Sequence, residues 1–230
     1  MLCAACSENS PEAAVPVSPG TSAGTPASAA PVLAVIDARS AQAAAIVTTS
    51  TASPSAYVFP FVGRAVSYGT THHDYPATDV FGCGAIVVAP TDGEVVETRD
   101  ADVWDPATDL AADRGGRFVS MVGHDGVRYY FAHLDIVLAV VGQVVRPGDP
   151  LGVMGSTGNA RGSACHTHMG ISRPCPAAEW AVRRGEVWPA PYLDAWRVGE
   201  PASPVLEVYA SAQADPAACD SAADLAAAPG

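Results

Sequence analysis

The chain has 230 residues, with 24 acidic and 12 basic side chains, and its formal net charge at pH 7 is -12. All of the basic residues are arginine, which excludes protein classes that depend on a lysine amine, such as Schiff-base enzymes, P-loop proteins and lipoyl or biotinyl carriers. Nucleic acid is not expected as a partner, because binding phosphates by counterion release requires a basic surface.

Residues 1–53 are predicted to form an N-terminal tether. The stretch up to about residue 31 is rich in Ala, Pro, Ser, Thr and Gly, and such a composition buries too little apolar surface to offset its chain entropy. The first six residues resemble the end of a bacterial lipoprotein signal, which makes Cys6 a candidate for a lipid anchor. The alternative is an incidental start with two unpaired cysteines, Cys3 and Cys6. A short alanine-rich helix is predicted near 32–47.

Residues 54–199 are predicted to form one mostly β, antiparallel domain, because short β-branched runs alternate with Gly, Asp and Pro from Tyr57 onward. Asp-Gly pairs at 92–93 and 125–126 are typical of turns that join antiparallel strands. In the strand from 127 to 133, Tyr129 and Tyr130 face opposite ways, so one is expected in the core and the other in a groove. The predicted strands are Ala85–Ala89, Gly93–Arg99, Arg117–Val122, Val127–His133, Leu151–Met154 and Thr167–Ser172.

The C-terminal part of the chain is predicted to consist of a closing segment and a tail. Residues 176–199 hold three tryptophans, which indicates a helical or irregular segment that closes over the sheet, chiefly by core packing. Residues 200–230 are Ala- and Asp-rich and are expected to be disordered or loosely docked.

The cysteines and the hydropathy indicate an exported protein without a membrane-spanning helix. No uninterrupted apolar run reaches the ~18 residues that a transmembrane helix needs, and six cysteines fit an oxidising compartment. Cys165 and Cys175 bracket one predicted strand, and a short hairpin there would place them in disulfide range. Cys83 would then pair with Cys219 or stay free, and the connectivity stays open at this stage.

The six histidines lie between positions 72 and 168. In His166-Thr167-His168 the two imidazoles project to one face of a strand, which suits a metal site. His133 lies near the end of an apolar strand, and His72 and His73 stand a turn away from Asp79. Two imidazoles and one carboxylate are a sufficient ligand set for catalytic zinc, whereas His124, in a Gly-His-Asp-Gly context, is expected to be an exposed turn residue.

Six motifs in this order resemble the lysostaphin-type (LytM-like) zinc metallopeptidases, a family of peptidoglycan endopeptidases. The resemblance runs from about Tyr57 to Gly199 and leaves both ends of the chain uncovered. The motifs are the His/Asp segment at 72–79, Gly84 through Val88-Ala-Pro-Thr-Asp-Gly-Glu-Val-Val96, Tyr130-Phe-Ala-His-Leu134, Gly142-Gln-Val-Val-Arg-Pro-Gly148, Gly155-Ser-Thr-Gly158 and His166-Thr-His168.

The resemblance implies one Zn²⁺ per domain, held by Asp79, His168 and either His72 or His73. Most members have three residues between the first histidine and the aspartate, whereas five follow His73 here and six follow His72. Neighbouring strand residues face opposite ways, so only one of the pair is expected to bind the metal.

The resemblance also implies that His133 and His166 handle protons in the hydrolysis of a peptide bond of peptidoglycan, in a stem peptide or a cross-bridge. Asn159 and Arg161, in a glycine-rich loop, are weaker candidates for substrate contact. The alternative is a catalytically silent LytM-like module that binds the cell wall or regulates a partner hydrolase. A monomer in the cell envelope or outside the cell is expected.

Overall fold

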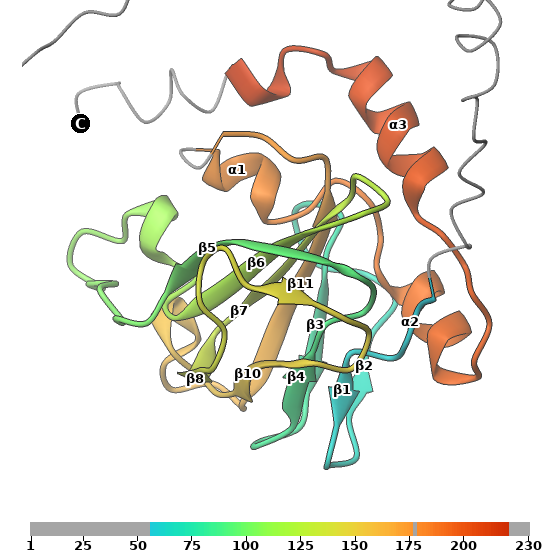
Figure 1. Ribbon diagram of the computed structural model, residues 1–230. Coiled ribbons are helices and arrows are strands. Elements are labelled where there is room, and N and C mark those ends of the chain that lie inside the picture. The colour runs from blue at the N-terminus through green and yellow to red at the C-terminus, as the bar shows by residue number, and fades with distance from the viewer. Residues whose placement is uncertain (1–55, 177–178, 221–230) are drawn as a thin grey trace, which may run out of the picture. The chain divides into compact units, whose positions relative to one another are not determined.

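The computed structural model describes residues 56–176 and 179–220 (Figure 1). The predictions for residues 1–53, including the lipid anchor at Cys6 and the helix near 32–47, lie outside the described residues. The strands are β1 (Phe61–Val62), β2 (Ser67–Tyr68), β3 (Thr78–Phe81), β4 (Ile86–Val88), β5 (Gly93–Arg99), β6 (Phe118–Gly123), β7 (Arg128–Ala132), β8 (Leu134–Val137), β9 (Val144–Val145), β10 (Pro150–Met154) and β11 (His166–Ser172). The helices are α1 (Trp180–Arg183), α2 (Ala190–Arg197) and α3 (Val205–Ala214), with 3₁₀ turns at Ala111–Asp113 and Gly158–Ala160.

The strands form two antiparallel sheets, which confirms the mostly β fold class. The larger sheet has seven strands in the order β2-β3-β11-β7-β6-β5-β9, and the smaller has four in the order β1-β4-β10-β8. Each predicted strand overlaps an observed one, and Gly93–Arg99 matches β5 at both ends. The shorter strands β1, β2, β3, β8 and β9 have no counterpart among the predicted ones.

The two Asp-Gly pairs have different roles. Asp125-Gly126 joins the paired strands β6 and β7, as predicted, and His124 in this turn is exposed. Asp92-Gly93 connects β4 to β5, which belong to different sheets, so the prediction that it closes an antiparallel pair is wrong. The chain crosses between sheets at this point instead.

The main core lies against one face of the larger sheet, because alternate side chains of its strands point to opposite faces. Tyr129 and Phe131 of β7 and Met169 and Ile171 of β11 belong to this core, together with apolar residues of the smaller sheet. Tyr130 points to the opposite face and packs in a small cluster with Phe118 and Ala132. Tyr130 also lines a cleft on that face, so one tyrosine lies in the core and the other in a groove, as predicted.

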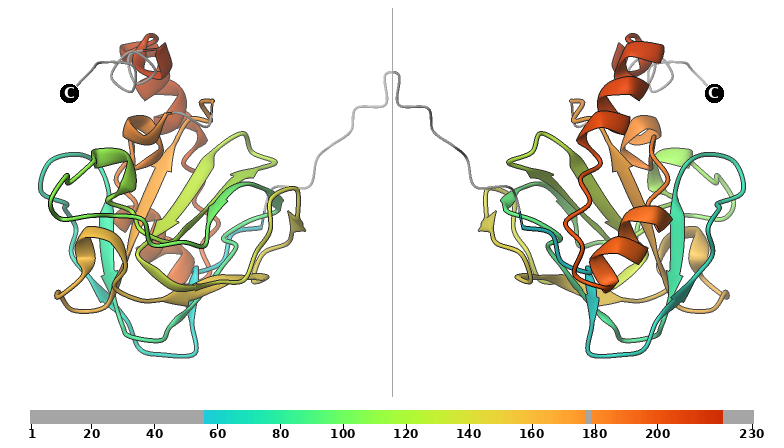
Figure 2. Two further views of the ribbon diagram at one scale, coloured as in Figure 1. Left: turned by 90° about the vertical axis from the view of Figure 1, so that its left-hand side faces the viewer. Right: turned by 90° about the vertical axis from the view of Figure 1, so that its right-hand side faces the viewer.

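The C-terminal segments cover the core and close its edge. Tyr192, Leu193 and Trp196 of α2, within the stretch predicted as an aromatic closing segment, are buried in the core. Residues 205–214 form α3 and bury Val208 against the core, so this part of the tail follows the docked alternative and not the disordered one. In the side views of Figure 2, the chain runs from α2 along the outside of the sheets to α3.

Two disulfides correct the predicted cysteine pairing. Cys83 is bonded to Cys165, and Cys175 is bonded to Cys219. Cys165 and Cys175 cannot pair because they flank the two ends of β11, whose seven residues span roughly 23 Å at 3.3 Å per residue. Cys165 instead meets Cys83 because β11 and β3 are neighbours in the sheet. No helix in the described part of the chain is long and apolar enough to cross a membrane.

Candidate active site

The site starts from the pairing of β3 with β11. His168 lies directly opposite Asp79 in the antiparallel register, and directly opposed residues project from the same face of a sheet. The Nδ1 atom of His168 is 3.1 Å from Oδ1 of Asp79. His166, two residues before His168, projects from the same face of β11 because strand side chains alternate.

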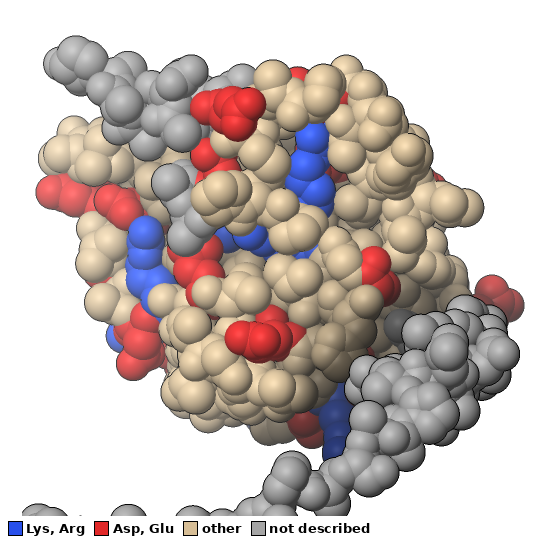
Figure 3. Space-filling view, turned by 45° about the horizontal axis from the view of Figure 1, so that its top comes forward, with Lys and Arg blue, Asp and Glu red and all other residues tan. Residues whose placement is uncertain are grey.

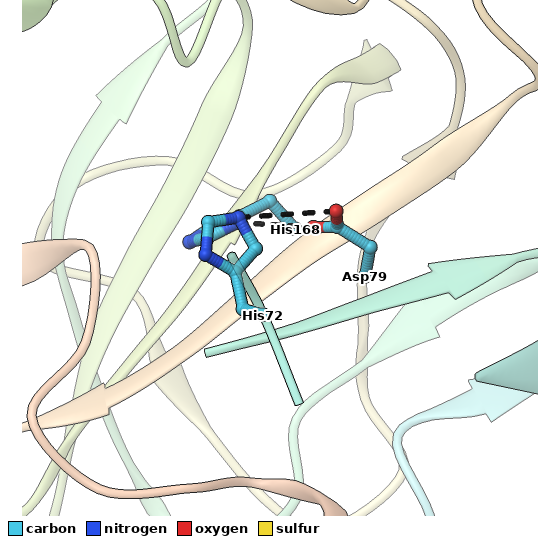
Figure 4. A group of neighbouring side chains, drawn as sticks. All are labelled: His72, Asp79 and His168. Carbon is cyan, nitrogen blue, oxygen red and sulfur yellow. Dashed lines mark hydrogen bonds and ion pairs between the residues drawn. The ribbon is translucent and has the colours of Figure 1, made fainter. Parts of the chain in front are cut away.

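His72 completes a three-residue cluster with Asp79 and His168. One potential ligand atom from each residue lies within 4.8 Å of the others, and Nε2 of His72 is 3.9 Å from Oδ2 of Asp79. Figure 4 shows the three side chains pointing toward one another. His73 points elsewhere: its side chain is 94% exposed and contacts Asp74.

Each ring nitrogen of His168 faces an oxygen atom. Its Nε2 atom is 2.9 Å from the carbonyl oxygen of Arg184, while Nδ1 faces the carboxylate of Asp79. A neutral imidazole has only one N–H group, so both oxygens are satisfied only if the ring gains a second proton or if Nδ1 and Asp79 share a cation. The donor set of two imidazoles and one carboxylate therefore fits a zinc ion.

The surroundings also shift the acid–base properties of the cluster. Burial would raise the pKa of Asp79, but the hydrogen bond with His168 and the adjacent imidazoles outweigh it and lower this pKa below its usual range. Burial, together with the neighbouring His168, lowers the pKa of His72. The Nδ1 atom of His72 is buried and has no hydrogen-bond partner.

His133 and His166 form a second pair of imidazoles beside this cluster, with ring centroids 4.9 Å apart. Nδ1 of His133 is 2.9 Å from the carbonyl oxygen of Thr157, and Nδ1 of His166 is 2.8 Å from that of Ala164. A carbonyl only accepts, so each Nδ1 donates, and each neutral ring keeps a lone pair on Nε2. Burial, with His168 and His166 nearby, lowers the pKa of His133 to about 3, which keeps this ring neutral.

A cleft of about 440 Å³ opens over these histidines. Of the two residues predicted to contact substrate, Asn159 lies in its wall, whereas Arg161 is not among the lining residues and pairs with Asp102. The cationic part of the wall and most of its aromatic part could not be predicted from the sequence, because single arginines and tyrosines have no characteristic spacing. These additional lining residues include Tyr75, Arg114, Tyr130, Trp180, Arg183 and Arg184.

Charges of both signs are interspersed on one face of the domain. On the face shown in Figure 3, arginine side chains alternate with acidic ones, and no large area has a single sign. Of the arginines in the cleft wall, Arg114 pairs with Asp109 and Arg183 with Glu97. Recognition of a ligand at this face therefore depends on local contacts more than on net charge.

A β-sheet cleft with a His-Asp-His cluster and two further imidazoles has the parts of a metal-dependent hydrolase. The model of peptidase family M23 matches residues 75–178 of this chain. The match includes Asp79, His133, His166 and His168, and it begins just after the loop with His72 and His73. It confirms the resemblance to the LytM-like peptidases.

Several solved structures of peptidases are similar to this chain. The catalytic domain of lysostaphin from Staphylococcus simulans is 23% identical over 57% of this chain and 91% of that domain, with a TM-score of 0.42. A longer lysostaphin chain is 25% identical over 58% of this chain and 50% of its own length, with a TM-score of 0.43. A putative glycyl-glycine endopeptidase LytM from Ruminococcus gnavus is 22% identical over 64% of this chain and 62% of its own, with a TM-score of 0.48. The match thus spans about half of the longer lysostaphin chain, and the curated proteins contain no match to the sequence.

Proposed function

We propose that the protein is an exported zinc-dependent endopeptidase that hydrolyses peptide bonds of bacterial cell-wall peptidoglycan. The observation that carries this proposal is the convergence of His72, Asp79 and His168 beside two imidazoles in the wall of a cleft. The family match supports the peptidase activity. The two disulfides fit an oxidising, extracellular setting.

His72, Asp79 and His168 would hold the zinc ion, and His73 would remain in solvent. When bound in such a site, zinc lowers the pKa of a water molecule and polarises the carbonyl that the water attacks. The carbonyl of Arg184 holds Nε2–H of His168, which leaves Nδ1 of that ring as the ligand atom.

His133 and His166 would transfer the protons that peptide hydrolysis requires. Each ring is oriented through Nδ1 by a backbone carbonyl, so Nε2 of either ring can accept a proton from water and return it to the departing amine. The lowered pKa of His133 keeps Nε2 free to accept at neutral pH. Either ring can therefore act as the base.

The activity is tested by incubating purified protein with isolated peptidoglycan, with and without a chelator, and identifying released fragments by mass spectrometry. We expect new amine termini that disappear with the chelator and return with zinc. If none appears under any condition while the protein still binds the cell wall, the silent binding module replaces the peptidase.

The neighbouring histidines offer a matched pair of variants for the metal site. His72→Ala is expected to lose bound zinc and activity, whereas His73→Ala keeps both, because only His72 faces Asp79 and His168. His168→Ala is expected to behave like His72→Ala. Metal content by mass spectrometry and cleavage of peptidoglycan are the two measurements, and normal zinc in His72→Ala would contradict the assignment.

A further inference from the structure

Arg184 differs from the other arginines of the cleft wall. Arg114 and Arg183 each pair with a carboxylate. The guanidinium of Arg184 has no ion pair or hydrogen bond with any described residue, and its Nε atom is buried without a partner. Nε of Arg183 is likewise buried without a partner, so what distinguishes Arg184 is that its two terminal nitrogens have no acceptor among the described residues and are not buried. These terminal N–H groups can receive an acceptor from a ligand.

Aromatic rings hold this guanidinium in place. Its central carbon lies 3.9 Å from the ring centroid of Tyr75 and 5.4 Å from that of Trp180. These cation–π contacts attract the guanidinium to the rings and leave its terminal N–H groups for hydrogen bonding. An arginine held in this way suits two parallel hydrogen bonds to a carboxylate.

The backbone of Arg184 is fixed relative to the proposed metal site. Its carbonyl oxygen accepts from His168, and strand β11 approaches it so closely that a Cβ on Gly170 would lie 2.4 Å from this oxygen. The backbone carbonyl of Arg184 therefore orients a proposed zinc ligand, while its side chain lines the cleft.

Among the described residues, no carboxylate forms an ion pair with Arg184. The charge of Asp74 reaches Arg184, but the Asp74 side chain is 70% exposed and contacts His73, and Asp79 contacts His72 and His168. The guanidinium therefore contributes a positive charge to the cleft that is free to attract a negatively charged group of a ligand.

We propose that Arg184 binds a carboxylate of the substrate and so makes the enzyme select acidic peptides over neutral ones. This inference rests on the proposed peptidase function and narrows its substrate to peptides with a free carboxylate near the scissile bond. It favours an acidic stem peptide over an uncharged cross-bridge.

The test compares muropeptides released by a muramidase with the same peptides after their carboxylates are amidated with carbodiimide and ammonia. Binding to the metal-free protein is measured by calorimetry, and cleavage by the zinc-loaded protein is measured as kcat/KM. Because hydrogen bonds to charged groups contribute roughly 1.5–3 kcal/mol, the wild type is expected to bind the acidic peptides about 10- to 100-fold more tightly.

The informative variant is Arg184→Gln, which removes the charge and keeps a polar side chain. It is expected to bind acidic and amidated peptides equally, at the affinity that the wild type has for the amidated ones. Arg197→Gln is the matched control, because Arg197 is also stacked on two rings, those of Phe59 and Tyr68, but is not among the residues that line the cleft. This control is expected to keep the wild-type preference.

The proposal is overturned if the wild type binds both peptides equally, or if folded Arg184→Gln keeps the full preference. The wild-type comparison needs no variant, so it decides the matter even if Arg184→Gln fails to fold. A preference in binding without any cleavage would overturn the peptidase function alone, and would leave Arg184 as a carboxylate site.

Discussion

His133 adopts a backbone conformation that is unusual for its residue type. Its φ angle is 63°, in the left-handed region where a side chain with a Cβ costs roughly 1–2 kcal/mol. The residue separates β7 of the larger sheet from β8 of the smaller one, so the turn that strains the backbone also moves the chain between sheets. This turn places the imidazole of His133 at the cleft. Glycine would adopt the same φ without strain but would lack the imidazole, so the strain is tolerated for the sake of the side chain.

Two variants separate this backbone strain from the loss of the imidazole. His133→Gly and His133→Ala both lose the ring, and both are expected to lose most of the activity. The glycine variant is expected to be more stable than the alanine variant by about 1 kcal/mol, because glycine adopts positive φ without steric cost. Urea unfolding of the two variants gives the difference, and an alanine variant of equal or greater stability would show that the conformation is unstrained.

At the scale of single residues, the histidine and aspartate positions could be predicted because they occur in short motifs. His166 and His168 follow from strand alternation, and the structure brings His168 and Asp79 together. The choice between His72 and His73 could not be predicted, because both lie in a loop whose path depends on distant contacts. The proposed role of Arg184 could not be predicted, because it depends on contacts with Tyr75 and Trp180. Tyr75 is distant in the sequence, and Trp180 belongs to no recognisable motif.

At the scale of elements, β11 organises the site because it pairs with β3 on one side and β7 on the other. Long strands such as β5 and β11 could be predicted from β-branched runs and alternation. Strands of two to four residues, such as β1 and β3, contain too few residues to show a period. The disulfide between Cys83 and Cys165 could not be predicted for the same reason, since it depends on β3 lying beside β11.

The contact between β11 and the end of α1 leads to a prediction at Gly170. A Cβ there would lie 2.4 Å from the carbonyl oxygen of Arg184, so Gly170→Ala must push the two segments apart. We expect a loss of about 1–3 kcal/mol in the free energy of unfolding, as overpacking typically causes, and weaker zinc binding because the carbonyl no longer orients His168. Denaturant unfolding and zinc titration measure the two effects.

Gly69→Ala is the control for this prediction. The nearest atom to a Cβ at Gly69 is the carbonyl oxygen of Thr71 at 3.8 Å, an ordinary contact. This variant is expected to keep both the stability and the zinc affinity of the wild type. If Gly170→Ala does the same, the close approach of α1 to β11 does not orient the proposed ligand.

At the scale of the whole molecule, buried tyrosines join segments that are far apart in the sequence. The hydroxyl of Tyr57 donates to Asp125 at 2.8 Å and lies 3.1 Å from Oγ of Ser203, and the hydroxyl of Tyr129 donates to the same carboxylate at 2.6 Å. These bonds connect the first described residues, the turn between β6 and β7 and the segment before α3. The chain has no lysine, so tyrosine is the main side chain that titrates between pH 10 and 12.

The stability of the domain should therefore fall over this alkaline range. Burial raises the pKa of Tyr57 from 10.0 to about 12, so between these values the unfolded chain loses a proton that the folded protein keeps. The contribution of Tyr57 to the free energy of unfolding is therefore fully present below pH 10 and is lost as the pH rises toward 12. Tyr57→Phe is expected to be less stable at pH 9 but to lose less on going to pH 11, whereas Tyr209→Phe, at a side chain that is 63% exposed, should follow the wild type. Urea midpoints at the two pH values measure this, and an equal decrease for all three proteins would show that Tyr57 contributes nothing to the alkaline transition.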